Sequence, residues 1–315
     1  MIRSRDFTLY LLAGLWLAAI AILAVMQPGA LALSTVTTVL QFSTILALVA
    51  LGQAMVILCG GAGIDLSVGG TMSLTAILSM MAVDAGMPGW LLVPACVAMG
   101  GVLGLANGLI VTRLGILPLI GTLGTFYIYS GTALAITSGA NIGNVPAGLT
   151  VWGRGILGGL PLPFLTLALP LFLIAGAILR FTSWGRWIYA AGFNERSARL
   201  VGIPVDRLRL AAYVASGALA GTAALVSLAW LGSARPNIGQ NLELTSLTAA
   251  MLGGIAIFGG RGGVIGVLAA VLLLVTVQTG LLLINVNSIW QLGIVGALLV
   301  AVLLVDTLAI VRRTS

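Results

Sequence analysis

The polar residues of this sequence that could do chemistry lie within long apolar stretches. Two are acidic and the others are neutral hydrogen-bonding residues: Gln53, Asp65, Ser67, Asn107, Thr122, Thr125, Tyr127, Glu243 and Gln278. In such a stretch each of them needs a protein partner or a water molecule. Because most of these groups donate and accept hydrogen bonds without charge, we treat all nine as candidates for lining a path for a neutral, hydroxylated solute.

Asp65 has two interpretations, because it follows a run of glycines and precedes an apolar stretch. It could cap the start of the next helix, or an acid at membrane depth could serve as a gate or substrate group. Glu243 occupies a similar place in the second half of the chain. The likeness of residues 65–67 to 243–245, and of 100–104 to 262–266, suggests an inverted repeat.

Several chemistries are excluded by composition, because all 14 basic residues are arginine and the chain has no histidine. A P-loop needs a lysine to reach the phosphates of ATP, so the energy for any work must come from a partner or an ion gradient. Cys59 and Cys96 lie in apolar surroundings without metal-ligand spacing, so we expect no metal site. The sequence has no basic stripe with interleaved aromatic residues, so nothing in it indicates a nucleic-acid partner.

The elements that position these residues are membrane spans. Only 7% of the residues are charged, 60% are hydrophobic, and the mean hydropathy is +1.19, which is typical of an integral membrane protein. Unbroken apolar runs favour helices over a barrel. We therefore predict an all-α polytopic membrane protein, a single domain over residues 1–315. About ten transmembrane helices are expected, at residues 8–26, 36–59, 66–84, 90–112, 116–137, 162–180, 208–231, 242–258, 263–284 and 289–311.

The arginines predict the orientation of these spans. With ten spans and a cytoplasmic N-terminus, twelve of the fourteen arginines fall on the cytoplasmic side and only Arg154 and Arg235 fall outside. Such a bias is the usual signature of membrane topology, and it places both termini in the cytoplasm. An external loop is then expected at about 138–161 and a cytoplasmic segment at about 181–207.

The cytoplasmic segment contains the pattern of one short, capped helix. Asn194 can cap its start, Glu195 suits its positive end, and Gly202 can end it. Arg196 and Arg199 would share one face. Because a loop that only sets topology does not need two caps, we predict a docking helix for a cytoplasmic protein. Its residues are Phe193, Asn194, Glu195, Arg196, Ser197, Ala198, Arg199, Leu200 and Gly202.

Small residues recur at helical spacing in two of the expected spans. Gly101, Gly104 and Gly108 lie in the span at 90–112, and similar glycines lie in the span at 208–231. In membrane proteins such stripes allow helices to approach closely. We therefore predict close helix packing at these stripes rather than a direct role in transport.

Several stretches in the same order resemble ribose-type ABC sugar permeases. Residues 185–203 resemble the coupling segment of that family, G-R-x-I-Y-A-x-G-x-N-E-x-A-A-R-L-S-G-I, and residues 63–69 match G-I-D-L-S-V-G. Residues 233–244 resemble S-A-x-P…G…E-L, and residues 253–262 resemble G-G-T-S-x-x-G-G-x-G. Asp306 stands where the family ends in L-L-A-V-x-x-D.

The resemblance implies an ABC importer permease in the bacterial inner membrane, with no enzymatic activity and no bound cofactor of its own. The resemblance also implies three partners within or beside the lipid bilayer. These are separate ABC ATPase subunits, which use the ATP, a periplasmic solute-binding protein, and a second permease chain. The chain departs from the family pattern at Ile255-Ala256, Thr245 and residues 278–280. These departures leave the solute open, and they suit one member of a paired, non-identical dimer as well as a homodimer.

Three other functions remain open from the sequence. An ion-coupled secondary transporter would use Asp65, Glu243 or Asp306 to bind a proton or Na⁺, but it would have no need of a capped helix near residue 195. An ABC permease for an amino acid or a signalling molecule would share every feature described above. A scaffold without transport activity is disfavoured by the polar residues within the spans.

Overall fold

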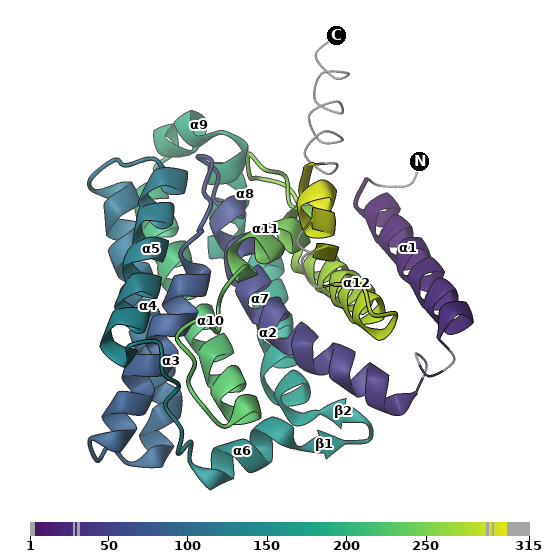
Figure 1. The fold of residues 1–315 in the computed structure, drawn as a ribbon. Helices are drawn as coiled ribbons and strands as arrows, with labels where there is room; N and C mark the ends of the chain where they lie inside the picture. The colour runs from purple at the N-terminus through teal and green to yellow at the C-terminus, as the bar shows by residue number, and fades with distance from the viewer. Residues whose placement is uncertain (1–3, 28, 30–31, 288–289, 292, 301–315) are drawn as a thin grey trace.

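The computed structural model describes residues 4–27, 29, 32–287, 290–291 and 293–300, which form a helical bundle with one short hairpin (Figure 1). The elements in chain order are α1 (Ser4–Met26), α2 (Leu33–Leu58), α3 (Val68–Asp84), η2 (Gly89–Leu91), α4 (Leu92–Thr112), α5 (Pro118–Thr137), α6 (Ala147–Arg154), β1 (Ile156–Leu157), β2 (Leu160–Pro161), η3 (Phe164–Ala168), α7 (Leu169–Phe181), α8 (Ser183–Phe193), α9 (Glu195–Leu200), α10 (Val205–Leu231), α11 (Leu242–Leu252) and α12 (Val264–Leu283). The described chain is therefore mostly helical, as predicted.

Seven of the described helical stretches are long and apolar enough to cross a membrane. They are α1, α2, η2 with α4, α5, η3 with α7, α10 and α12. Each coincides with a predicted span, and two further predicted spans coincide with the shorter apolar helices α3 and α11. The last predicted span, 289–311, lies mostly outside the described residues, as do Asp306 and the C-terminus; residues 290–291 and 293–300 are helical.

Helices α2 and α10 form the centre of the bundle. In an apolar 18-residue stretch of each helix, 89% of the residues are buried in α2 and 67% in α10, but only 6% in α1. Helix α2 packs against α11 and α12, helix α10 packs against α3 and α4, and the two central helices pack against each other. Helices α3, α4, α11 and α12 therefore surround this central pair, while α5 packs on α3 and α1 packs on α12 at the edge of the bundle (Figure 1).

The tightest helix pair is α4 with α10, where glycines bring two backbones into contact. A Cβ atom at Gly100 or Gly104 would collide with the backbone of Gly217, and a Cβ at Gly221 would collide with that of Cys96. Gly101 differs, because a Cβ there would meet only side-chain atoms at 3.9 Å. The predicted close packing is thus present, but Gly100 rather than Gly101 makes the contact.

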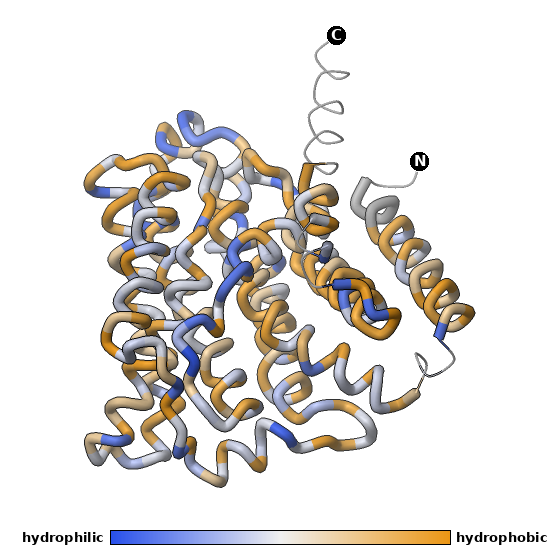
Figure 2. The backbone as a smooth tube through the Cα atoms, in the orientation of Figure 1, coloured by the Kyte–Doolittle hydropathy of each residue, from blue (hydrophilic) through white to orange (hydrophobic). Residues whose placement is uncertain are grey.

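Two irregular segments run into the bundle and end at the short helices. Residues 60–67, here termed the α2–α3 segment, lead into α3, and residues 232–241 lead into α11. The second is the hydrophilic connection that passes through the middle of Figure 2. The second segment meets the start of α3, where Gly239 packs against Gly69 and the Gly239 N–H donates to Ser73 Oγ at 3.1 Å. Irregular backbone at membrane depth is tolerated where protein buries it in this way.

Four glycines join three segments at the end of the bundle that carries α9. Gly60, Gly192, Gly259 and Gly260 lie backbone against backbone, with no room for a Cβ on any of them. The N–H of Gly260 also donates to the carbonyl oxygen of Leu58 at 3.1 Å. We term this contact the glycine joint; it ties the end of α2 to the end of α8 and to the α11–α12 connection.

The two long connections contain more structure than the sequence predicts. The predicted external loop contains α6 and the β1–β2 hairpin, and Arg154 Nε donates to the carbonyl oxygen of Trp230 at 2.9 Å. The prediction of a single helix in residues 181–207 is incomplete, because this stretch holds α8, α9 and the first residues of α10. Helices α8 and α9 lie at the opposite end of the bundle from α6 and the hairpin (Figure 1).

The glycine contact between α4 and α10 predicts that two neighbouring substitutions differ in effect. Gly104→Ala must push the helices apart and should lower the free energy of unfolding by about 1–3 kcal/mol. Gly101→Ala fills open space and serves as the matched control. Thermal unfolding of the purified chain in detergent compares them, and equal melting temperatures for the two variants would contradict the observed packing.

Candidate functional site

The buried carboxylate of Asp65 is the centre of a polar cluster inside the bundle. Its Oδ1 accepts hydrogen bonds from Ser67 Oγ at 2.6 Å and from the Ser67 N–H at 3.1 Å. Its Oδ2 accepts from Ser216 Oγ of α10 at 2.8 Å. Asp65 is only 1% exposed, so these bonds replace the water that a charged or polar carboxyl would otherwise hold.

Four more candidate residues complete this cluster, which we term the Asp65 cluster. Asn107 Nδ2 of α4 donates to Ser67 Oγ at 2.6 Å, and the side-chain amide of Gln53 in α2 faces the backbone N–H and carbonyl of Asp65. Thr122 Oγ1 of α5 accepts from the backbone N–H that follows Asp65, at 3.0 Å, and Thr125 Oγ1 donates to the Thr122 carbonyl. Six of the nine candidates thus lie together.

Asp65 makes the hydrogen bond of a capping side chain and also a contact outside α3. Its Oδ1 accepts from the Ser67 N–H, two residues along the chain, and its Oδ2 accepts from Ser216 of α10. The N-cap residue next to α3 is Ser67, whose own side chain makes no capping bond. The sequence analysis missed Ser216 and Tyr213, whose hydroxyl donates to the carbonyl of Ile64 at 3.3 Å. Their spacing of three on one face of an apolar helix is the signal that could have identified them.

The other three candidates lie apart from the Asp65 cluster. Tyr127 is 67% exposed on α5, and Gln278 is half-buried on α12. Glu243 lies in the first turn of α11 beside Gly69, and its Oε2 is buried with no hydrogen-bond partner among the described residues. Among the residues that the structure describes, no three acidic or cysteine residues lie close enough together to hold a metal ion.

A cavity of about 130 Å³ lies against the α2–α3 segment, toward the end of the bundle that carries α9. Its walls come from the segment, from the α4–α5 turn and from α10. The lining residues are Val56, Gly60, Gly61, Gly63, Val111, Gly115, Ile116, Leu117, Pro118, Arg209, Ala212 and Tyr213. The cavity therefore reaches the segment that holds Asp65, but Asp65 itself is not in its wall.

Helix α9 has both predicted caps. The Asn194 side chain accepts a hydrogen bond from the Ser197 N–H at 2.9 Å. At the other end the Gly202 N–H donates to Arg199 and the Ile203 N–H to Ala198, with Gly202 at φ +82°. This pair of bonds is the Schellman arrangement, which needs a left-handed residue at the position of Gly202. The caps confirm that the sequence specifies this short helix.

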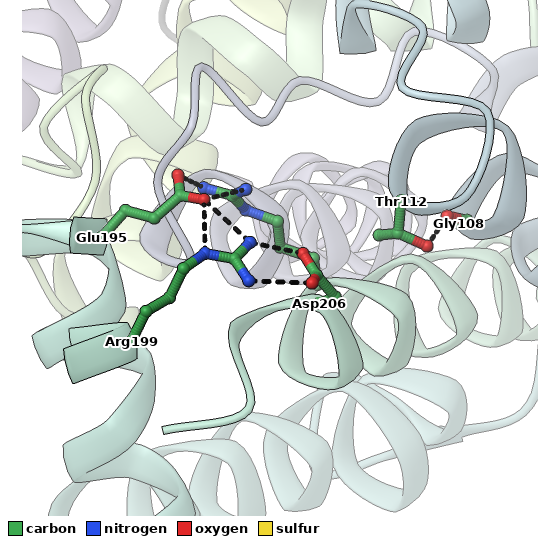
Figure 3. Close-up of polar contacts among 6 residues, drawn as sticks. Gly108, Thr112, Glu195, Arg199 and Asp206 are labelled. Atoms are coloured by element: carbon green, nitrogen blue, oxygen red, sulfur yellow. Dashed lines mark hydrogen bonds and ion pairs between the residues drawn. The ribbon is translucent and has the colours of Figure 1, made fainter. Parts of the chain in front are cut away.

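Two charged residues of α9, Glu195 and Arg199, are paired with each other and with residues of α10. Figure 3 shows Arg199 between Glu195 and Asp206, with shortest distances of 2.9 and 2.6 Å. Arg209 also binds Glu195, at 2.5 Å from Oε2 and 3.1 Å from Oε1. The hydrogen bonds from Arg209, and then those from Arg199, hold the pKa of Glu195 below its ordinary value. Arg196 and Arg199 are both exposed, as the predicted arginine face requires, and Arg199 is in addition held in ion pairs.

Large apolar side chains are exposed around α9. Phe193 is 77% exposed, Leu200 82% and Val201 77%, whereas Ala198 is buried against the bundle. Phe193 ends α8 just before α9, and Leu200 and Val201 lie at the end of α9. Exposed apolar residues at both ends of a short, capped helix are typical of a surface that contacts another protein. We term these three residues the α9 patch.

Comparison with known proteins identifies the class to which this arrangement belongs. Residues 35–303 match the family model of the branched-chain amino acid transport system / permease component. The chain belongs to this permease family. No solved structure matches it.

Named relatives cover most of this permease. The ribose import permease protein RbsC of Bacillus subtilis is 36% identical, over 91% of this chain and 89% of its own length. RbsC of Escherichia coli K12 is 33% identical over 91% and 90%. The autoinducer 2 import system permease protein LsrD of Klebsiella pneumoniae is 36% identical over 84% and 81%. The chain is therefore a multi-pass membrane permease of a bacterial ABC importer and has no ATPase site of its own.

The Asp65 cluster predicts that two buried serines of α10 contribute differently to the stability of the fold. Ser216→Ala leaves Asp65 Oδ2 without its partner and should cost about 1–3 kcal/mol of unfolding free energy. Ser227→Ala is the matched control, because its hydroxyl is equally buried and has no partner within the described residues. Thermal unfolding in detergent measures both, and a Ser216→Ala variant as stable as Ser227→Ala would contradict the role given to Ser216.

Proposed function

We propose that the chain forms the membrane path of an ABC importer for a sugar or a similar small polar solute. A periplasmic binding protein delivers the solute, and separate ATPase subunits supply the energy. The chain itself binds no cofactor. The observation that carries the proposal is the α9 patch at the ends of a doubly capped helix, which coincides with the coupling segment expected from the family resemblance.

A sugar-like solute is the choice that the relatives and the polar residues favour. Two relatives are named for ribose and one for autoinducer 2. The Asp65 cluster offers neutral donors and acceptors on four helices, but its centre is sealed in this structure, so the solute would reach it only after a rearrangement. The family description names branched-chain amino acids, which keeps an amino-acid solute as the second candidate. Membership in an ABC permease family argues against ion-coupled transport.

We further propose a single transmembrane domain of ten spans with both ends in the cytoplasm. Helices α8 and α9 and most loop arginines lie at one end of the bundle, and Arg154 lies at the other. Excess arginine marks the cytoplasmic side. The segment 232–241 and α11 then together make one crossing, because the short helix starts inside the bundle.

The topology is tested with a reporter that is active only in the periplasm. Fused after Ser315, it should give no activity, and fused within the external connection near Gly143 it should be active. A C-terminal fusion that is active would contradict ten spans. The Gly143 fusion also controls for expression, because both proteins carry the same reporter.

An inverted repeat is supported by the packing of the central helices. Helix α2 packs against α11 and α12, and α10, which is five predicted spans later, packs against α3 and α4. In each half the short helix follows an irregular segment, and the two short helices meet near Gly69 and Gly239. Broken helices that meet near the membrane midplane are typical of transporters built from repeats.

Docking of an ATPase on α9 predicts a specific effect of changing its cap. Gly202→Val places a β-branched residue at positive φ, a conformation that glycine adopts without strain and valine does not. A Cβ at Gly202 would meet no other atom, so the strain is confined to the backbone of the cap. The variant should reach the membrane at normal levels but lose co-purification of the ATPase and solute uptake. Gly263→Val is the control, because Gly263 has equal space and an extended φ of −167°. Wild-type uptake by Gly202→Val would contradict the docking proposal.

The permease is proposed to work as a dimer. ABC ATPases act in pairs, and each chain offers one α9, so two permease chains would present two docking helices. The second chain can be identical or a related, non-identical permease. The substitutions at Thr245, Ile255 and Ala256 relative to the family pattern agree with a paired, non-identical partner.

A further inference from the structure

One face of α10 contacts the α2–α3 segment at successive points. Arg209, Tyr213 and Ser216 are spaced by four and three residues and therefore share this face. Tyr213 donates from its hydroxyl to the carbonyl of Ile64, and Ser216 donates to the carboxylate of Asp65. The position of α10 and the position of the segment are thus linked by hydrogen bonds.

Arg209 extends this contact to helix α9. Its guanidinium lies against Gly61 so closely that a Cβ at Gly61 would have no room. The same guanidinium makes two hydrogen bonds to the carboxylate of Glu195. The side chain of Arg209 is only 15% exposed, so this pair is shielded more than an ordinary surface ion pair.

We propose that Arg209 is a positioning residue that holds the α2–α3 segment in place and transmits displacements of α9 to it. Glu195 fixes the guanidinium from one side, and the guanidinium closes over Gly61 on the other. A movement of α9 therefore draws Arg209 away from the segment, whose far end carries Asp65. The inference rests on the proposed docking of an ATPase on α9, which would supply that movement.

The surroundings of the segment allow it to move. The 130 Å³ cavity separates part of the segment from the α4–α5 turn, and Gly60, Gly61, Gly63 and Arg209 line it. Gly60 is held by the glycine joint, but Gly61, the next residue, has positive φ and carries no side chain that would anchor the segment. Arg209 lies against Gly61 and lines the same cavity, so its removal takes away the contact that covers Gly61 on this side.

The chain contains a natural reporter for this movement. Cys59 caps the end of α2 directly before the segment and is fully buried, with its Sγ 4.0 Å from the carbonyl oxygen of Leu208 in α10. Cys96 is equally buried but lies near the start of α4. These are the only two cysteines of the sequence, so the reaction of each with N-ethylmaleimide can be followed by peptide mass spectrometry.

The test measures maleimide modification of the full-length chain in membrane vesicles without any ATPase. Glu195→Gln and Arg209→Gln should each speed modification of Cys59 about tenfold, because a charge-assisted pair that limits local opening is lost. The double variant should react no faster than either single one, because both residues act through the same contact. Arg209→Lys, which keeps the charge, should restore most of the protection.

Asp206→Asn is the matched control, because Asp206 also binds α9 from α10 but its ion pair goes only to Arg199. It should leave Cys59 as protected as in the wild type. Protection of Cys59 in both Gln variants would overturn the proposal, and so would reaction of Cys96 in step with Cys59, which indicates general loosening. Because no ATPase is present, this outcome is independent of whether α9 docks one.

Discussion

The rest of the structure depends on keeping one carboxylate, that of Asp65, satisfied within an apolar bundle. A buried acid without hydrogen bonds costs several kcal/mol, so the chain must bring donors to it. Ser67 supplies two from its own segment and Ser216 supplies one from α10. Asn107, Thr122 and Gln53 then hold α4, α5 and α2 at the same place. Four helices and the α2–α3 segment are thereby fixed relative to one another.

A second constraint is the absence of side chains where backbones must meet. Within a membrane the apolar surfaces of helices gain little from being buried against each other, so close backbone approach and hydrogen bonds decide which helices pair. Gly100 and Gly104 allow α4 to reach α10, and Gly69 and Gly239 allow the start of α3 to meet the segment that leads into α11. Helix α10 therefore combines both constraints, since it carries Ser216 beside Gly217.

The helices were predictable because a membrane span needs about 20 apolar residues, and that length is visible in the sequence. The caps Asn194 and Gly202 were predictable because their hydrogen bonds are local. The partner of Asp65 was not, because Ser216 lies 151 residues away and nothing local indicates the pairing. Likewise Gly101 and Gly100 are adjacent, and choosing between them requires the rotation of α4. Tyr127 was included for being polar within a span, although its ring points out of the bundle.

The glycine joint has a mechanical consequence. A side chain at a contact can change rotamer and absorb a small displacement, whereas Gly60, Gly192, Gly259 and Gly260 have none to rotate. At this joint the end of α8 therefore contacts the end of α2 and the connection between α11 and α12 through backbone atoms alone, with no side chain between them that could adjust. A displacement of the end of α8 meets the first half of the chain, at α2, and the second half, at the α11–α12 connection, through the same set of backbone contacts.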